Sequence, residues 1–199
     1  MIPRHLLIGT GFLLIGALGL TLYAFHMRGR VTQVSSAATD ARPVAPPVSG
    51  PTERVTLYVA WDDAGTLHPQ AVNIPLPSAR QQRAEELLRS LVSTYLDKNS
   101  THPIPPGSDI RAVYLVEPGL AVIDLNPGFA NGHRSGVLEE ELTVTSLIQT
   151  LTANLPGILK VKILVDGKER DTLAGHADLS TFYDAAAVSQ LVAEMQSSQ

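Results

Sequence analysis

An uninterrupted apolar run near the amino terminus places the strongest constraint on how this chain can fold. Leu6–Phe25 reads LLIGTGFLLIGALGLTLYAF and contains no charged side chain. About 20 helical residues are long enough to cross the ~30 Å hydrocarbon layer of a bilayer. Arg4 precedes the run, and Arg28 and Arg30 follow it. We therefore expect a transmembrane helix over residues 6–25, preceded by a tail at 1–5, so that the lipid bilayer is one partner of the protein.

A cleaved signal peptide is the alternative interpretation of this run. Signal peptidase requires small residues just before the cut, and the nearest such pair, Ala17 and Gly19, lies inside the run. Ser36 and Ala38 come late, so we favour an uncleaved anchor. Positive charges on the two sides of the run are nearly balanced. The charge rule therefore does not decide on which side of the membrane the rest of the chain lies.

Residues 26–54 are predicted to form a tether between the anchor and a folded domain. The stretch VTQVSSAATDARPVAPPVSGPTER, from Val31 to Arg54, is rich in Pro, Ser and Ala and nearly free of large apolar side chains. Such a segment buries too little apolar surface to offset the entropy lost on ordering, so we expect it to be disordered and extended. It would hold the domain away from the bilayer.

Composition excludes several classes of function for the remainder of the chain. From Val55 onward there are ten Lys and Arg residues against seventeen Asp and Glu residues, and an acidic surface repels nucleic acid. The chain has no cysteine, which removes disulfides, thiolate zinc sites and iron–sulfur clusters. No two histidines are spaced as in a zinc-hydrolase helix. We expect no nucleic-acid partner, no metal and no cofactor.

Hydrophobic periodicity predicts one α+β domain over residues 55–182, followed by a C-terminal helix and tail at 183–199. The order of elements is β(β)αββαβ, with the second strand less clearly marked, and it favours one mostly antiparallel sheet with two main helices on one face. The predicted strands are Val55–Ala60, Thr66–Ile74, Ile110–Val116, Leu120–Leu125 and Ile158–Val165. In the two helices the residues expected in the core are Ala84, Leu87, Leu88, Leu91, Val92 and Tyr95, then Leu138, Leu142, Thr145, Leu147, Ile148 and Leu151.

Catalytic motifs are incomplete in this sequence. Residues 132–136 read GHRSG and resemble a nucleophile elbow, but the motif GxSxG requires serine at position 134, where Arg134 stands. Lys168 follows a glycine as in a phosphate-binding loop, but Lys162 occupies the position of that motif's first glycine. We therefore assign no catalytic residue.

Two clusters of ionisable residues remain as candidates. Glu139, Glu140 and Glu141 could supply carboxylates, but consecutive helical residues point in different directions, which favours a solvated first helical turn. His176 and Asp178 lie two residues apart and would share one side of an extended segment. They are either half of a catalytic or metal site, which lacks a third partner, or a hydrogen-bonded pair that orders the segment. We favour the second interpretation.

Polar residues at the ends of two apolar strands are further candidates. Asp124 ends one strand and Asn126 follows it, whereas Asp166 and Gly167 follow the last strand. Binding residues often lie where a strand passes into a loop. Turn and capping roles are the alternative and are favoured for the two aspartates. For Asp166 and Gly167 a structural turn is predicted, in which glycine adopts a positive φ.

Three stretches resemble the GerMN domain family, which is named after a sporulation and germination protein. They are VTLYV from Val55, then IPPGSDIRAV from Ile104 with AVIDLNPGF ending at Phe129, and TLT from Thr150 followed by LPGI and VKILVDG. The segment TLAGHADL, which starts at Thr172, is similar to the tail of the family. The resemblance covers about residues 55–182 in a single copy.

The resemblance implies a domain carried outside the cytoplasm with a non-enzymatic role in the cell envelope. We therefore expect a single-pass membrane protein with its amino terminus inside, whose partner is cell-wall glycan (peptidoglycan) or another envelope protein. The alternative is an envelope hydrolase that uses His176 and Asp178. The candidate binding residues are Asp124, Asn126, Asp166, Gly167, His176 and Asp178.

Overall fold

The computed structural model describes residues 51–197. The predicted tail, the anchor at Leu6–Phe25 and the tether up to residue 50 lie outside the described residues and stay predictions. Within the part that is described, no helix is both long and apolar enough to cross a membrane. The first strand begins at Thr52, inside the range predicted for the tether.

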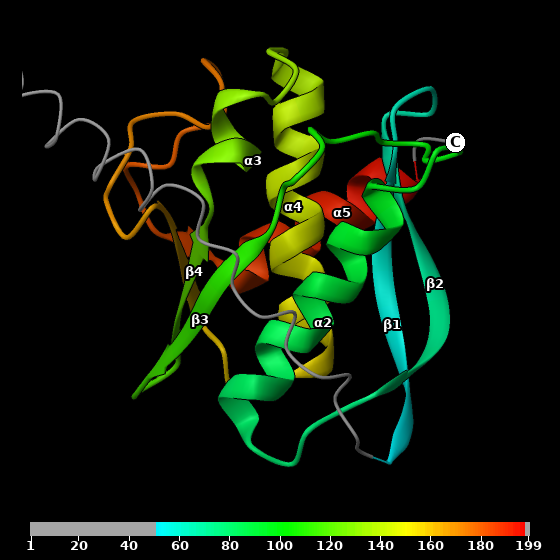
Figure 1. Ribbon diagram of the computed structural model, residues 1–199, viewed down its shortest axis with the longest axis vertical. Coiled ribbons are helices and arrows are strands. Elements are labelled where there is room, and N and C mark those ends of the chain that lie inside the picture. The colour runs from blue at the N-terminus through cyan, green and yellow to red at the C-terminus, as the bar shows by residue number, and fades with distance from the viewer. Residues whose placement is uncertain (1–50, 198–199) are drawn as a thin grey trace, which may run out of the picture. The chain divides into compact units, whose positions relative to one another are not determined.

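The described residues form the α+β fold that the sequence predicts (Figure 1). A strand pair is followed by a helix, a hairpin, two helices, a strand and a short C-terminal unit. In chain order the elements are β1 (Thr52–Trp61), β2 (Thr66–Pro75), α2 (Arg80–Tyr95), β3 (Ile110–Val116), β4 (Leu120–Leu125), α3 (Pro127–Asn131), α4 (Val137–Asn154), β5 (Lys160–Val165), β6 (Tyr183–Asp184) and α5 (Ala185–Ser197).

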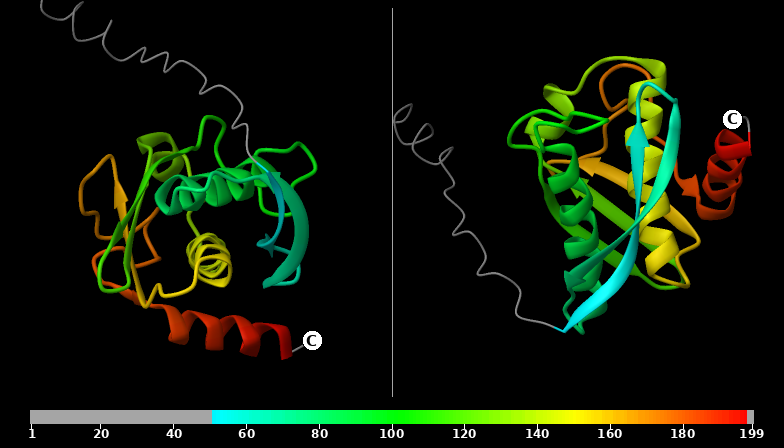
Figure 2. Two further views of the ribbon diagram at one scale, coloured as in Figure 1. Left: turned by 90° about the horizontal axis from the view of Figure 1, so that it is seen from below. Right: turned by 90° about the vertical axis from the view of Figure 1, so that its right-hand side faces the viewer.

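The prediction of a single, mostly antiparallel sheet is wrong, because the strands form two sheets. β1 and β2 make an antiparallel pair, and a second sheet has the order β3-β4-β5-β6 with β4 and β5 parallel. The helices α2 and α4 lie between the two sheets, and α5 packs against α4 and β2 (Figures 1 and 2).

Helix side chains explain why β1 does not join the larger sheet. The amide of Tyr58 donates a hydrogen bond of 2.9 Å to the hydroxyl of Thr150 on α4. Asn154, also on α4, accepts from the amide of Thr56 at 3.1 Å and donates to its carbonyl at 2.7 Å. A strand edge leaves backbone groups that must be paired when they are buried. Polar side chains of α4 take the place of a neighbouring strand here.

The predicted helical cores are confirmed with one exception. All six residues predicted for α2 are buried, and so are five of the six predicted for α4. Leu138 is 41% exposed, because it lies in the first turn of α4 beside the β1–β2 turn at Gly65. The buried set of α4 also includes Thr143 and Ser146, because this helix is enclosed by the β1–β2 pair and by α2 and α5.

Replacing Thr150 by valine tests the role of α4 in covering the β1 edge. Valine has nearly the same shape but accepts no hydrogen bond, so the buried amide of Tyr58 would lose its partner. We expect a loss of about 1–3 kcal/mol in the free energy of unfolding, measured by urea denaturation of residues 48–199. Thr152→Val is the matched control, because that hydroxyl bonds only within α4. Equal stability of the two variants would contradict this role.

Candidate functional site

The predicted residues at the ends of β4 and β5 form a turn joined by an arginine. Asp166 and Gly167 both have positive φ, 56° and 71°, and Val165 pairs with Lys168 across them, as in a two-residue hairpin. Buried Asp124 accepts the amide of Gly167 at 2.8 Å. Arg111 lies 3.6 Å from the Asp124 carboxylate and also pairs with Asp166. The positive φ predicted for Gly167 is confirmed.

Asn126 is placed at the start of α3 by hydrogen bonds of its own side chain. Its oxygen accepts from the amides of Phe129 at 2.9 Å and Asp109 at 3.2 Å, and its amide group donates to the carbonyl of Gly107 at 2.7 Å. These contacts cap the short helix and fix the preceding loop. A ligand-binding role for Asn126, and for the turn at Asp166, stays a prediction.

Glu140 is buried, and the prediction of a solvated first turn is wrong for this residue. Its side chain on α4 is 0% exposed, and one carboxylate oxygen accepts the amides of Ala174, His176 and Ala177, each at 2.9 Å. The other oxygen lies 3.0 Å from Nδ1 of His176. Burial raises the pKa of Glu140, but these hydrogen bonds outweigh it and lower the pKa from 4.5 to about 2. The carboxylate therefore fixes residues 174–177 onto α4.

The predicted hydrogen-bonded pair of His176 and Asp178 is not formed. Asp178 instead accepts the amide of Ser180 at 2.7 Å and its hydroxyl at 2.6 Å, which lowers the pKa of Asp178. Nδ1 of His176 faces both Glu140 and, at 3.4 Å, the hydroxyl of Ser135. A serine, histidine and carboxylate triad needs its serine and its carboxylate on opposite ring nitrogens. This arrangement does not meet that requirement.

His176 and Asp178 do share a cavity, which we call the α4–α5 cavity. Its volume is about 300 Å³, and it lies between α4, the segment 176–178, β6 and α5. Aliphatic side chains make up much of its wall, and a few polar groups stand among them. The apolar residues are Val137, Val144, Ala177, Val188 and Leu191, and the polar ones are Glu141, Thr145, His176, Asp178 and Tyr183.

The polar groups of the α4–α5 cavity include two carboxylates, those of Glu141 and Asp178. The hydroxyl of Tyr183 donates to the carbonyl of Asp178 at 2.5 Å. Burial, followed by the negative charges of Asp178 and Glu141, raises the pKa of Tyr183 to about 12. Among the described residues that line the cavity there is no lysine or arginine. The cavity thus combines an apolar wall with two carboxylates and no lysine or arginine.

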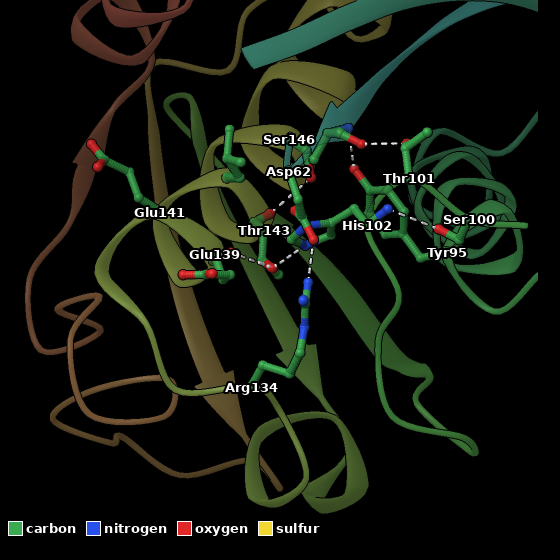
Figure 3. A network of polar contacts seen from close by, with 12 residues as sticks. Asp62, Tyr95, Ser100, Thr101, His102, Arg134, Glu139, Glu141, Thr143 and Ser146 are labelled. Atoms are coloured by element: carbon green, nitrogen blue, oxygen red, sulfur yellow. Dashed lines mark hydrogen bonds and ion pairs between the residues drawn. The ribbon is translucent and has the colours of Figure 1, made fainter. Parts of the chain in front are cut away.

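A polar network holds the loop before α4 in place (Figure 3). Buried His102 contacts Asp62 at 2.5 Å through Nδ1 and Thr143 of α4 at 2.6 Å through Nε2. The hydroxyl of Thr143 also meets Nε2 of His133 at 2.7 Å, and Arg134 pairs with Asp62. Burial is the main cause that lowers the pKa of both histidines below the usual 6.5. The sequence did not predict this network, because most of its contacts join residues that are about 40 or more positions apart in the sequence.

Comparisons with known proteins match the chain to one family. A family model described as "Germane: Sporulation and spore germination" matches residues 56–171. None of the curated proteins matches the chain.

One solved structure agrees with this match at the level of the fold. The tandem GerMN domains of the sporulation protein GerM from Bacillus subtilis are 24% identical with a TM-score of 0.50, and the match covers 66% of this chain and 45% of that chain. The first GerMN domain of that protein is 23% identical with a TM-score of 0.45, covering 65% and 95%. A "Putative Lipoprotein from Clostridium perfringens" is 22% identical with a TM-score of 0.47, covering 71% and 92%.

Replacing Glu140 by glutamine should destabilise the domain in a pH-dependent way. A neutral amide accepts hydrogen bonds more weakly than a carboxylate, so we expect a loss of about 2–3 kcal/mol in the free energy of unfolding at pH 7. The pKa of Glu140 in the folded state, about 2, lies below its ordinary value of 4.5. The stabilisation is therefore complete above pH 4.5 and is lost as the pH falls toward 2.

Urea denaturation of residues 48–199 between pH 7 and pH 2.5 measures this dependence. The difference between the wild-type protein and Glu140→Gln should shrink as the pH falls through this window. Glu141→Gln is the control and should stay within about 0.5 kcal/mol of the wild-type protein, because Glu141 is only half-buried. A difference between wild type and Glu140→Gln that does not change with pH would contradict this account of Glu140.

Proposed function

Since the chain belongs to the Germane family of sporulation and spore germination proteins, we propose that it is a non-enzymatic binding or scaffolding module of the cell envelope. Its ligand is a cell-wall glycan with its attached peptides, or another envelope protein. Part of that ligand is held in the α4–α5 cavity. The GerMN-type domain is the binding unit, and the rest of the chain tethers it.

The observation that carries this proposal is the construction of the cavity. One wall belongs to α4, and the opposite wall includes residues 176 and 177. They belong to the segment 174–177, which Glu140 holds through three backbone amides and the ring of His176. A mostly apolar concavity with a few polar groups is the usual form of a ligand site. A wall that is already fixed reduces the entropy lost on binding.

The hydrolase alternative has less support from the same geometry. It requires His176 to act as a base together with Asp178, but Asp178 is held by Ser180. General acid–base catalysis needs its groups within hydrogen-bond reach of one reacting atom. In this chain Glu140 holds the ring of His176 on its Nδ1 side, which fits an ordering role for the imidazole.

We place the module on the extracytoplasmic side of the cytoplasmic membrane. The proposed anchor is the uncharged run Leu6–Phe25, with the amino terminus inside the cell. The family to which the chain belongs supports this orientation. The composition of residues 26–50 suits a tether between the anchor and the domain. The acidic charge of the domain fits a target other than anionic lipid.

Narrowing the cavity tests the proposed function. Val137 lies at the cavity and is 65% exposed, so Val137→Trp should obstruct binding without disturbing the core. We expect the full chain to sediment with purified peptidoglycan, or to crosslink reproducibly to one envelope protein. The variant should lose at least nine-tenths of that signal. Val116→Trp is the matched control, because Val116 is 47% exposed and lies outside the cavity, on β3.

Each outcome of this test has a defined meaning. A reproducible protein partner without retention on the wall would overturn the glycan version and support the protein version. Undiminished binding by Val137→Trp would overturn the assignment to the α4–α5 cavity. The absence of both wall retention and a protein partner would contradict the binding function as a whole.

A further inference from the structure

The apolar wall of the α4–α5 cavity limits what can occupy it. Val144 and Val188 are buried at its base, and Val137 and Leu191 complete an aliphatic surface. The volume of about 300 Å³ is at the lower end of the range for ligand cavities, roughly 300–1,000 Å³. The cavity therefore suits one aliphatic side chain rather than a length of polymer.

Two carboxylates at this cavity form no ion pair. Neither Glu141, on α4, nor Asp178 forms an ion pair with any residue in the described range 51–197, whereas Asp62 and Asp166 do so elsewhere in the domain. Hydrogen bonds from Ser180 are the main cause that lowers the pKa of Asp178, and the charge of Lys162, whose ammonium binds the carbonyls of Leu179 and Ser180, contributes less. Tyr183 lies close enough to both carboxylates for their charges to raise the pKa of its hydroxyl. Two negative charges thus lie beside the aliphatic wall.

The other ionisable group at the cavity does not neutralise this charge. The ring of His176 is engaged through Nδ1 with Glu140, whose own carboxylate is already satisfied by three backbone amides. Unpaired carboxylates next to an apolar surface are stabilised by an incoming cation, because the reduced local dielectric constant strengthens the attraction. A ligand that provides both an aliphatic stem and a cation satisfies both features at once.

We propose that the α4–α5 cavity binds an aliphatic ammonium group, with its hydrocarbon stem on the aliphatic wall and its charge beside Glu141 and Asp178. The inference rests on the proposed function and specifies its ligand. A lysine side chain of a protein has this chemistry, and so does the free side-chain amine of a diamino acid in a cell-wall stem peptide. Pentylamine is a simple probe with this chemistry.

Ligand-detected NMR titration of the full chain in an uncharged detergent tests the proposal. Pentylamine should bind at least tenfold more tightly than 1-pentanol, which has the same stem without the charge. Glu141→Gln should weaken pentylamine binding at least tenfold and leave 1-pentanol unchanged. Glu139→Gln, in the same helical turn but outside the cavity lining, should leave both affinities unchanged. Both variants are compared with the wild-type chain in the same detergent, so any partition of the probes into detergent contributes equally to each measurement and cancels.

The remaining outcomes separate this inference from the proposed function. Equal affinity for the amine and the alcohol, or an unchanged affinity in Glu141→Gln, would overturn the ammonium assignment and leave the cavity as an apolar site. Failure of both probes to bind would overturn it as well, and the sedimentation and crosslinking test with Val137→Trp would then decide the proposed function on its own. If pentylamine binds, two further probes identify the source of the amine by their relative affinities. One is Nα-acetyl-lysine amide, whose side-chain amine is free, and the other is a stem peptide with a free side-chain amine.

Discussion

The buried carboxylate of Glu140 is the interaction on which the candidate site depends. A charge without solvent contact is costly unless hydrogen bonds replace its hydration. Three backbone amides of residues 174–177 and the ring of His176 provide those bonds. The same contacts satisfy amides that would otherwise lack a partner in an irregular segment. One side chain therefore joins α4 to the segment that forms the facing wall of the cavity.

Other polar side chains of α4 are also buried and bonded to neighbouring segments, as Glu140 is. Helix α4 contacts the β1–β2 pair as well as α2 and α5, so its polar residues are buried on several sides. Thr150 and Asn154 bond the edge of β1, and Thr143 joins two histidines. In the described part of the chain no buried side-chain nitrogen or oxygen lacks a hydrogen-bond partner. These directional bonds fix the position of the β1–β2 pair, which apolar packing alone would leave less defined.

Local sequence patterns predicted the longer elements of this fold but not α3 and β6, nor how the strands divide into sheets. The spacing of Leu87, Leu88 and Leu91 reflects helical periodicity, and the hairpin of β3 and β4 follows from a short turn between apolar runs. The edge of β1 is instead satisfied by side chains 92 and 98 residues away in the sequence. No local pattern contains that information, so one continuous sheet was the simpler expectation.

At the candidate site, too, the sequence predicted local features but not contacts between residues that are distant in the sequence. His176 and Asp178 were identified from their sequence and both lie at the cavity, but their expected pairing was wrong. Glu140 resembles any acidic residue in the first turn of a helix, and its real partners are 34 to 37 residues further along the chain. The turn at Asp166 and Gly167 was predictable, because its constraint is the local backbone conformation.

Amide hydrogen exchange tests most directly whether Glu140 fixes the wall of the cavity. Exchange at the amides of Ala174, His176 and Ala177 should be slow at pH 7 in the wild-type domain and at least tenfold faster in Glu140→Gln. The amide of Tyr58, which is bonded to Thr150, should exchange at the same rate in both proteins if the variant keeps its global fold. Fast exchange of the three amides in the wild-type domain, or equal protection in the variant, would contradict the account.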